Sequence, residues 1–352
     1  MTRPTHGGNL DWAVTLINCP NSAVLDFSAS INPLGPPQST IEAIIKGIKQ
    51  LAHYPNPDYP QFRQAIGQHH HICQDWVLPS NGAAELLTWI AWEAHNLEGV
   101  LLPSPCFADY KRALNTFNIP FESYGLDELA MGLKYRGNVA LLVNNPHNPT
   151  GKLWDKKTLI PYLQQFPLVV IDEAFMDFLP PNEQESLIDL IPDYDNLIVV
   201  RSITKFYSLP ALRIGYGITH PDRIKKWQKW RDPWTVNSLA QLAGIEALKD
   251  TEFQQKTWQW LKPSREKLKD DLAQIKGLKP LPSSANFILV ETRIPSPQLQ
   301  LELLQREQIL IRDCLSFPEL GEKYFRVAVR TQEDNQRLSN AITQTYQEIN
   351  SI

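Results

Sequence analysis

Residues 202–215 have the sequence SITKFYSLPALRIG, in which one lysine stands among small hydroxyl residues. The apolar run Leu197–Val200 leads into it and, bounded by polar residues, is typical of a buried strand in a parallel sheet. Lys205 follows that strand end, where poor solvation lowers the pKa of an amine and favours Schiff-base formation. Taken alone, a lysine here is more simply a surface residue in a turn.

The residues around Lys205 provide a reason to prefer the chemical interpretation. Ser202 and Thr204 offer hydroxyl donors, and Arg213 offers a fork of N–H groups eight positions after the lysine. These are the donors that a phosphate monoester beside Lys205 would need.

Two other predicted strands end in polar residues. Leu168–Ile171 ends at Asp172, at the sheet edge where open α/β sheets bind their ligands, although an aspartate that caps the next helix is common. Residues 139–143 lead into Asn148, in a loop that two prolines stiffen and that is otherwise an ordinary turn.

A predicted helix begins in Ser80–Leu87, with small and polar residues at its start. A helix N-terminus presents free N–H groups and a positive dipole end to an anion, and Gly82 would let the backbone approach it closely. The signal is weak alone, because most capped helices bind nothing.

Composition narrows the class of protein. The 352 residues suit a large domain plus a smaller one, and 43% apolar with 20% charged residues is an ordinary globular balance. A net charge of −4 does not suggest nucleic-acid binding, and neither an apolar signal core nor a run of 18 apolar residues occurs, so we expect a soluble cytoplasmic protein without a membrane segment.

Four dispersed cysteines without CxxC favour reduced thiols. Only His69 and Cys73 could share a helical face, too few ligands for a metal site, and we expect a solvated helix end there.

Four motifs carry a resemblance to a known superfamily. Their order and spacing resemble the fold-type I aminotransferase superfamily, whose cofactor is pyridoxal 5′-phosphate (PLP): NPTG at 148–151, DEAF at 172–175, SxTK at 202–205 and RxG at 213–215. Three further features resemble its L-threonine-O-3-phosphate decarboxylase family: HGGN at 6–9, Phe175 where many aminotransferases have tyrosine, and the Arg312-Asp313-Cys314 motif.

The resemblance implies a fold and a cofactor site. It implies a mostly parallel seven-stranded α/β domain at 41–250, a small α+β domain at 251–352, and an N-terminal arm at 1–40 that reaches the active site. Lys205 would carry PLP and Asp172 would protonate its ring nitrogen, making the ring an electron sink. The implied cofactor-binding residues are Tyr54, Asn81, Gly82, Ala83, Phe107, Asn148, Asp172, Ser202, Thr204, Lys205 and Arg213. A core aromatic at Phe107 and a loop aromatic at Tyr54 are the simpler alternatives.

The resemblance also implies a substrate, which is L-threonine O-3-phosphate, decarboxylated to (R)-1-amino-2-propanol O-2-phosphate in cobalamin synthesis. Arg330 would hold the substrate carboxylate and Arg312 its phosphate, on strands predicted at 309–312 and 324–330. The other implied substrate contacts are His6, Gly7, Ser30 and Asn148. Ser30 replaces the family's asparagine and is shorter.

Quaternary structure and alternative functions follow from the same resemblance. We expect a homodimer in which Tyr54 crosses to the neighbouring subunit's cofactor phosphate. The main alternative is histidinol-phosphate aminotransferase, which depends on 2-oxoglutarate. A PLP-binding transcription regulator would need an added basic DNA-binding domain, for which 352 residues leave no room.

Overall fold

A computed structural model describes residues 3–17, 20, 23–135 and 137–349, and the chain divides into two compact units. Unit 1 contains residues 1–34, 148–152 and 258–352, and unit 2 contains residues 35–147 and 153–257. Unit 1 therefore combines segments from both ends of the chain with the short segment 148–152, which the sequence-based boundaries place in the large domain. Cys19 lies outside the described residues.

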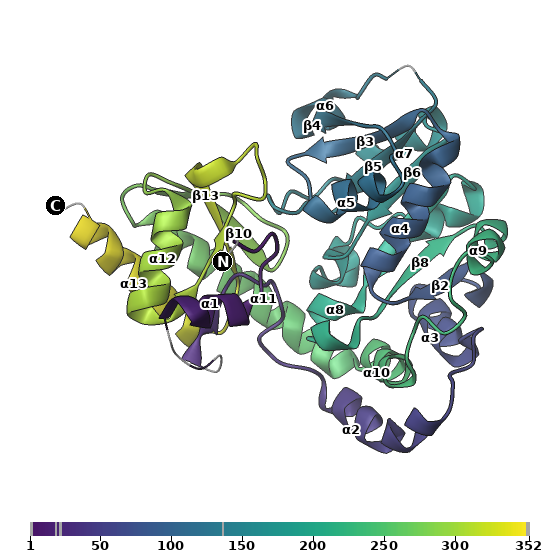
Figure 1. The fold of residues 1–352 in the computed structure, drawn as a ribbon, viewed down its shortest axis with the longest axis horizontal. Helices are drawn as coiled ribbons and strands as arrows, with labels where there is room; N and C mark the ends of the chain where they lie inside the picture. Colours follow the sequence, from purple (N-terminus) through teal and green to yellow (C-terminus); the bar gives the residue numbers. More distant parts are fainter. Residues whose placement is uncertain (1–2, 18–19, 21–22, 136, 350–352) are drawn as a thin grey trace. The chain divides into compact units, whose positions relative to one another are not determined.

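Unit 2 is built on a seven-stranded sheet with the order β2-β8-β7-β6-β5-β3-β4 (Figure 1). β8 runs antiparallel to its neighbours β2 and β7, and the other pairs are parallel, which confirms the predicted mostly parallel α/β fold. β5, β6 and β7 are buried along their whole length, which explains their continuous apolar sequence. The strands are β2 Val77–Ser80, β3 Gly99–Ser104, β4 Phe121–Gly125, β5 Val139–Asn144, β6 Leu168–Asp172, β7 Leu197–Ser202 and β8 Gly215–Thr219.

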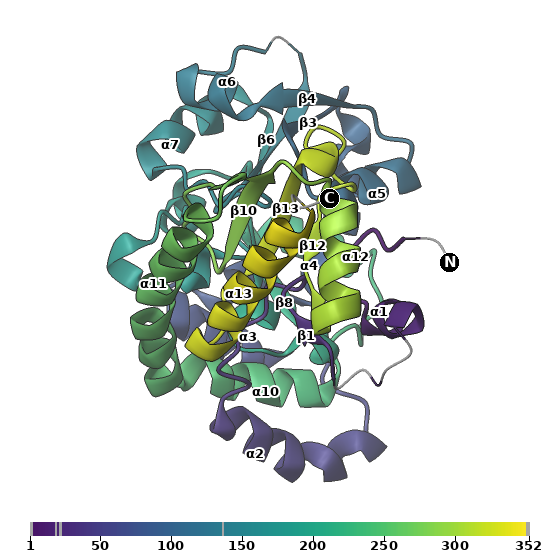
Figure 2. The same cartoon turned by 90° about the vertical axis from the view of Figure 1, so that its left-hand side faces the viewer.

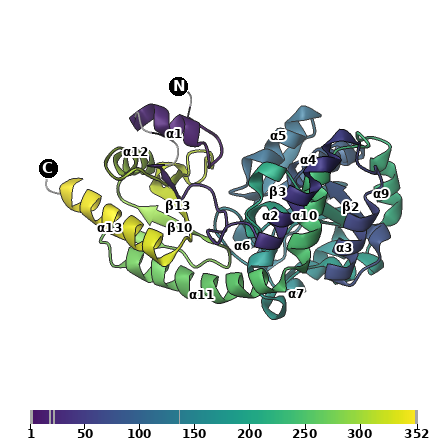
Figure 3. The same cartoon turned by 90° about the horizontal axis from the view of Figure 1, so that it is seen from below.

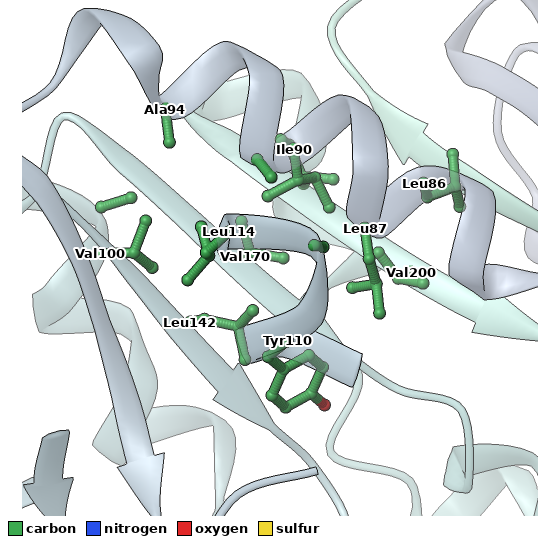
Figure 4. Close-up of a cluster of buried hydrophobic side chains, with 14 of the residues drawn as sticks. Leu86, Leu87, Ile90, Ala94, Val100, Tyr110, Leu114, Leu142, Val170 and Val200 are labelled. Atoms are coloured by element: carbon green, nitrogen blue, oxygen red, sulfur yellow. The ribbon is translucent and has the colours of Figure 1, made fainter. Parts of the chain in front are cut away.

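Helices cover this sheet and bury its apolar face. Leu86, Leu87 and Ile90 of α4 meet Tyr110 and Leu114 of α5 over the central strands (Figure 4). The hydrophobic effect provides most of the free energy of this packing, since each fully buried large side chain contributes about 1.5–3 kcal/mol relative to an exposed one. The helices are α2 Gln38–Gly47, α3 Pro60–His70, α4 Ala83–Glu93, α5 Ala108–Thr116, α6 Leu126–Met131, α7 Lys156–Gln165, α8 Ile203–Phe206, α9 Pro221–Gln228 and α10 Ser238–Lys249.

The spacing of Ile41, Ile44, Ile45 and Ile48 predicts one amphipathic helix over residues 41–51, and the structure shows this helix in two parts. α2 packs beside α10 and continues as a 3-10 helix, Ile48–Ala52 (Figure 3). Its apolar stripe remains uncovered: Ile41, Ile45 and Ile48 are 37%, 61% and 52% exposed. Large apolar side chains are therefore exposed along one face of this helical segment.

Unit 1 holds a four-stranded antiparallel sheet with the order β12-β13-β10-β9, and a short parallel pair of β1 and β11. The helices α12 and α13 lie side by side (Figure 2). The strands are β1 Leu25–Asp26, β9 Leu278–Pro280, β10 Phe287–Thr292, β11 Ile309–Leu310, β12 Arg312–Asp313 and β13 Tyr324–Ala328. The helices are α1 Leu10–Ile17, α12 Ser296–Glu307 and α13 Gln332–Ile349, while α11 Thr251–Ala273 begins in unit 2 and ends in unit 1.

Two predicted strands differ from the structure. The run 309–312 is divided between β11 and β12, which belong to different sheets. β13 ends at Ala328, so Arg330 lies beyond the strand on which the sequence placed it. The α+β character of this region agrees with the sequence.

The helix end at residues 69–73 is less solvated than expected. His70 is partly buried, its Nε2 lies 2.7 Å from the hydroxyl of Tyr216, and burial lowers the pKa of His70 well below its usual 6.5. Among the described residues, no three His, Cys, Asp or Glu side chains are grouped so as to hold a metal ion. Nor does the described chain contain a helix long and apolar enough to cross a membrane.

Candidate functional site

The strand ends of unit 2 bring several of the predicted residues to one sheet edge. In the parallel core the register pairs Asn144 with Asp172 and Asp172 with Val200. Gly215, at the start of antiparallel β8, pairs with Ser202 on one side and with Ser80 on the other. The C-terminal ends of β2, β6 and β7 therefore share one edge, where ligands of such sheets bind.

A cradle for an anion forms where β2 turns into α4. Gly82 has a φ of +72° and caps α4, and a Cβ on it would lie 2.6 Å from Nη2 of Arg213. A side chain at Gly82 would therefore displace the guanidinium from the helix N-terminus. The neighbouring Ser80 hydroxyl is buried and has no hydrogen-bond partner among the described residues. Free helix N–H groups, a guanidinium and an unsatisfied hydroxyl together suit a phosphate group.

Lys205 lies on α8, one turn after β7. Its Nζ lies over the ring of Phe175, 4.7 Å from the ring centroid, so one side of the amine faces an aromatic surface without a hydroxyl. Ser202 is buried as the last residue of β7, and Thr204 donates from Oγ1 to the Ile214 carbonyl at 3.3 Å. The β7–α8 turn thus places these predicted residues within four positions of the lysine.

Asp172 is buried at the end of β6 and is held by two hydrogen bonds. The hydroxyl of Tyr110 donates to its Oδ2 at 2.6 Å, and the Ala174 amide donates to its Oδ1 at 3.0 Å. Burial raises the pKa of Asp172, although the Tyr110 bond and the charge of Lys205 oppose the shift. Phe107 meets Tyr110 edge to face at 5.6 Å, which links the predicted stacking residue to the carboxylate.

Tyr54 is the cofactor-binding candidate of unit 2 that stands apart. Its side chain is 81% exposed, and its ring lies 4.7 Å from that of Trp234.

Unit 1 contains a buried cation that the sequence analysis did not assign. Arg326 is 8% exposed and donates from Nη1 to Oδ1 of Asn148 and from Nη2 to the Ser28 carbonyl at 3.4 Å. Its Nε has no hydrogen-bond partner, and within the described chain it forms no ion pair. Burial, with the charge of Arg312, lowers the pKa of Arg326 to about 10. A buried guanidinium without a carboxylate is costly unless an anion joins it.

Arg312 binds the N-terminal arm. Its guanidinium donates to the carbonyls of Pro4 and Thr5. His6 and Gly7 directly follow Thr5 in the sequence. Gly7 lies tightly on Ser28, since a Cβ there would be 2.2 Å from the Ser28 carbonyl oxygen. The arm, Arg312 and Arg326 therefore form one cluster in unit 1.

The remaining substrate candidates are engaged in different ways. The Ser30 carbonyl accepts from Asn286 at 2.9 Å, and the buried Ser30 hydroxyl has no hydrogen-bond partner in the described part of the chain. Arg330 pairs with Asp334 at 3.1 Å and donates to the Asp26 carbonyl at 3.1 Å. Its charge is thus already matched, whereas that of Arg326 is not.

The sequence did not single out three residues that contact the candidate site residues, although each is marked by a pattern in the sequence. Tyr110 follows Phe107 by three positions, a helical spacing that puts both on one face. Ser28 stands in the same turn-rich stretch as Ser30. Arg326 lies in the predicted strand with Arg330, and alternation alone could not decide which of the two is paired.

The chain is similar to known proteins over nearly its whole length. Residues 22–342 match the family described as aminotransferase class I and II. The threonine-phosphate decarboxylase of Salmonella typhimurium is 34% identical over 96% of this chain and 95% of its own. The adenosylcobalamin biosynthesis bifunctional protein of Leptospira interrogans is 33% identical over 98% of this chain and 41% of its own. The solved histidinol-phosphate aminotransferase of Clostridium acetobutylicum superposes with a TM-score of 0.85 at 29% identity, over 92% of this chain and all of that one.

Proposed function

Because the chain belongs to the aminotransferase class I and II family, we propose that it uses PLP to decarboxylate L-threonine O-3-phosphate. The products are (R)-1-amino-2-propanol O-2-phosphate and CO2, and the reaction serves cobalamin synthesis. The observation that carries the proposal is the pair of buried arginines in unit 1, Arg312 and Arg326. A substrate with two separate anionic groups, a carboxylate and a phosphate, suits two such cations.

The residues of unit 2 fit PLP. The cradle of Gly82 and Arg213, with the partnerless hydroxyl of Ser80, offers donors for the cofactor phosphate. The other residues of unit 2 that would hold the cofactor are Asn81, Ala83, Phe107, Asp172, Ser202, Thr204 and Lys205. Asn148 of unit 1 is a further predicted cofactor ligand. When bound, PLP supplies an electron sink for the charge left at the substrate Cα.

Asp172 and Lys205 would manage the protons of the reaction. The ionised carboxylate of Asp172 would pair with the protonated pyridine nitrogen, and the Tyr110 hydroxyl, which donates to its Oδ2, fixes its orientation. The Lys205 amine would deliver a proton to the substrate Cα after CO2 departs. The Phe175 ring beside Nζ leaves this amine no competing hydroxyl on that side.

We assign the substrate carboxylate to Arg326 rather than to Arg330. Among the described residues Arg326 has no ionic partner and its Nε is unsatisfied, whereas Arg330 is paired with Asp334. Arg312, beside the arm that carries His6 and Gly7, then serves the phosphate. Holding both ends of the substrate would select the carboxylate, rather than the α-hydrogen, as the group that leaves, which is catalysis by orientation.

A homodimer completes the proposal. The exposed apolar stripe of α2 and its 3-10 continuation, ending near Tyr54, suits a second copy of the chain. Tyr54 would reach the cofactor phosphate of that copy. Size measurement by light scattering tests this directly, and a monomer at micromolar concentration would contradict it.

One substrate comparison tests the activity. Purified PLP-loaded protein receives L-threonine O-3-phosphate alone, or L-histidinol phosphate with 2-oxoglutarate, and release of CO2 or glutamate is followed. We expect CO2 from the first mixture. The similarity to histidinol-phosphate aminotransferases makes the second activity the rival, and rapid glutamate formation without CO2 would establish it instead.

A further inference from the structure

Two exposed aromatic side chains of unit 2 contact each other at the end of the α2 stripe. The rings of Tyr54 and Trp234 lie 4.7 Å apart at an interplanar angle of 34°. Trp234 is 44% exposed and Tyr54 81% exposed, so neither ring is buried in the core of its own chain. An exposed aromatic ring can rotate unless a neighbouring group packs against it, and here each ring packs against the other.

The loop that carries Trp234 contacts Tyr59, five positions after Tyr54. The hydroxyl of Tyr59 donates to the Pro233 carbonyl at 2.6 Å, and the guanidinium of Arg231 lies over the Tyr59 ring at 5.7 Å. The Asp232 carboxylate accepts from the Trp234 amide at 2.7 Å, which fixes the turn on which the indole stands. These bonds set the position of the indole independently of Tyr54.

Tyr54 has little support from its own loop. Pro55 and Pro57 follow it, so the segment has no regular secondary structure, and the side chain projects into solvent. A tyrosine that must reach a phosphate on another subunit would lose binding energy if its ring first had to be ordered. The Trp234 contact removes part of that cost.

We propose that Trp234 is a positioning residue, which holds the Tyr54 ring in the orientation that reaches the cofactor phosphate of a second copy of the chain. The inference rests on the proposed function, and specifically on Tyr54 acting across the dimer. Trp234 itself touches neither the cofactor nor the substrate in this scheme. Its effect must therefore disappear when Tyr54 is absent.

A double-mutant cycle on PLP affinity tests this dependence. The apparent Kd for PLP is titrated spectroscopically in Trp234→Ala, Tyr54→Ala and the double variant, without substrate. An aromatic contact of this kind predicts about three- to tenfold weaker binding for Trp234→Ala, a smaller loss for Trp234→Phe, and no further loss from Trp234→Ala in the Tyr54→Ala background. Additive losses in the cycle would overturn the proposal, because they would show that Trp234 acts without Tyr54.

Controls separate positioning from folding and from dimerisation. Trp92→Ala removes another indole of unit 2 with 41% exposure and should leave the Kd for PLP unchanged. Light scattering on Trp234→Ala should still give a dimer. A monomeric variant with lost PLP affinity would assign Trp234 to the interface and overturn the positioning role.

Mixed dimers show across which subunit the pair acts. Trp234→Ala and Lys205→Ala chains carrying different tags are co-expressed and isolated as hybrids. The site containing Lys205 then receives an intact Tyr54–Trp234 pair from the other chain and should bind PLP with wild-type Kd. The same hybrid made with Tyr54→Ala tests the proposed function by itself. If the wild-type Kd for PLP is recovered in the hybrid with Tyr54→Ala but not in the hybrid with Trp234→Ala, this inference alone is overturned. If the wild-type Kd is recovered in neither hybrid, the proposal that Tyr54 crosses to the other subunit is refuted.

Discussion

Arg326 donates a hydrogen bond from Nη1 to Oδ1 of Asn148, across 178 positions of the chain. This bond ties the guanidinium to the segment 148–152, which groups with unit 1 although the sequence around it belongs to unit 2. In the described part of the chain the Nε of Arg326 has no partner and no carboxylate pairs with the guanidinium, which leaves it able to bind an anion. Asn148 therefore connects the residue that we assign to the substrate with the motif that we assign to the cofactor.

The first prediction compares Arg326 with Arg330. Arg326→Lys should raise KM for L-threonine O-3-phosphate by on the order of 100-fold, since a bidentate pair with a carboxylate loses at least one charge-assisted bond. Arg330→Lys, the matched control, should change KM little, because Asp334 occupies that guanidinium. Steady-state kinetics measure both. The reverse ranking would return the carboxylate to Arg330.

Lys205→Ala gives the second prediction. The variant should bind PLP but lack the visible absorbance band of lysine-bound cofactor, and borohydride should no longer fix the cofactor to the protein. Lys152→Ala, a lysine in the short segment of unit 1, should retain both properties. A reducible protein–cofactor bond in Lys205→Ala would exclude Lys205 as the attachment site.

Asp172→Asn should keep PLP yet lose most of its turnover, because an amide cannot hold the ring nitrogen protonated. A second effect is expected without cofactor. Burial raises the pKa of Asp172, so the stability linked to its protonated form is present below pH 3.8 and lost as the pH rises through the native pKa. Asp172→Asn should therefore raise the Tm of cofactor-free protein at pH 7.5. Calorimetry measures this, and a clear fall in Tm would show that the carboxylate stabilises the empty site.

The sequence predicted the sheet and its polar edge because both depend on local rules. Short continuous apolar runs bounded by polar residues are typical of strands buried on both faces, and β5, β6 and β7 are such strands. Asp172 and Ser202 were therefore placed correctly at strand ends. The turn after β7 follows from the same rule, and it brings Lys205 to that edge.

What the sequence could not provide was the pairing of charges. Arg326 and Arg330 are equivalent in the alternation of a strand, and only the tertiary structure shows that Asp334 pairs with one and that Asn148 contacts the other. The same limit applied to His70, whose partner Tyr216 lies 146 positions away. The exposure of the apolar face of α2 could not be predicted either, because amphipathic periodicity indicates an apolar stripe but not which element covers it.

The last prediction concerns pH and His70. Burial and the charge of Arg201 lower the pKa of His70 well below 6.5, so the native state holds this imidazole neutral beside the Tyr216 hydroxyl. A lowered native pKa contributes stability that is complete above 6.5 and is lost as the pH falls towards the native value, because the unfolded chain takes up the proton first. One such group changes the free energy of unfolding by at most about 1.4 kcal/mol per pH unit.

His70→Gln keeps a donor and acceptor but cannot titrate, so the stability of this variant should fall less steeply between pH 7 and 5 in urea unfolding. His71→Asn is the control, since His71 is exposed with a φ of +57°, which asparagine tolerates, and it should retain the wild-type slope. Equal slopes for wild type and His70→Gln would show that His70 is not the titrating group in this range.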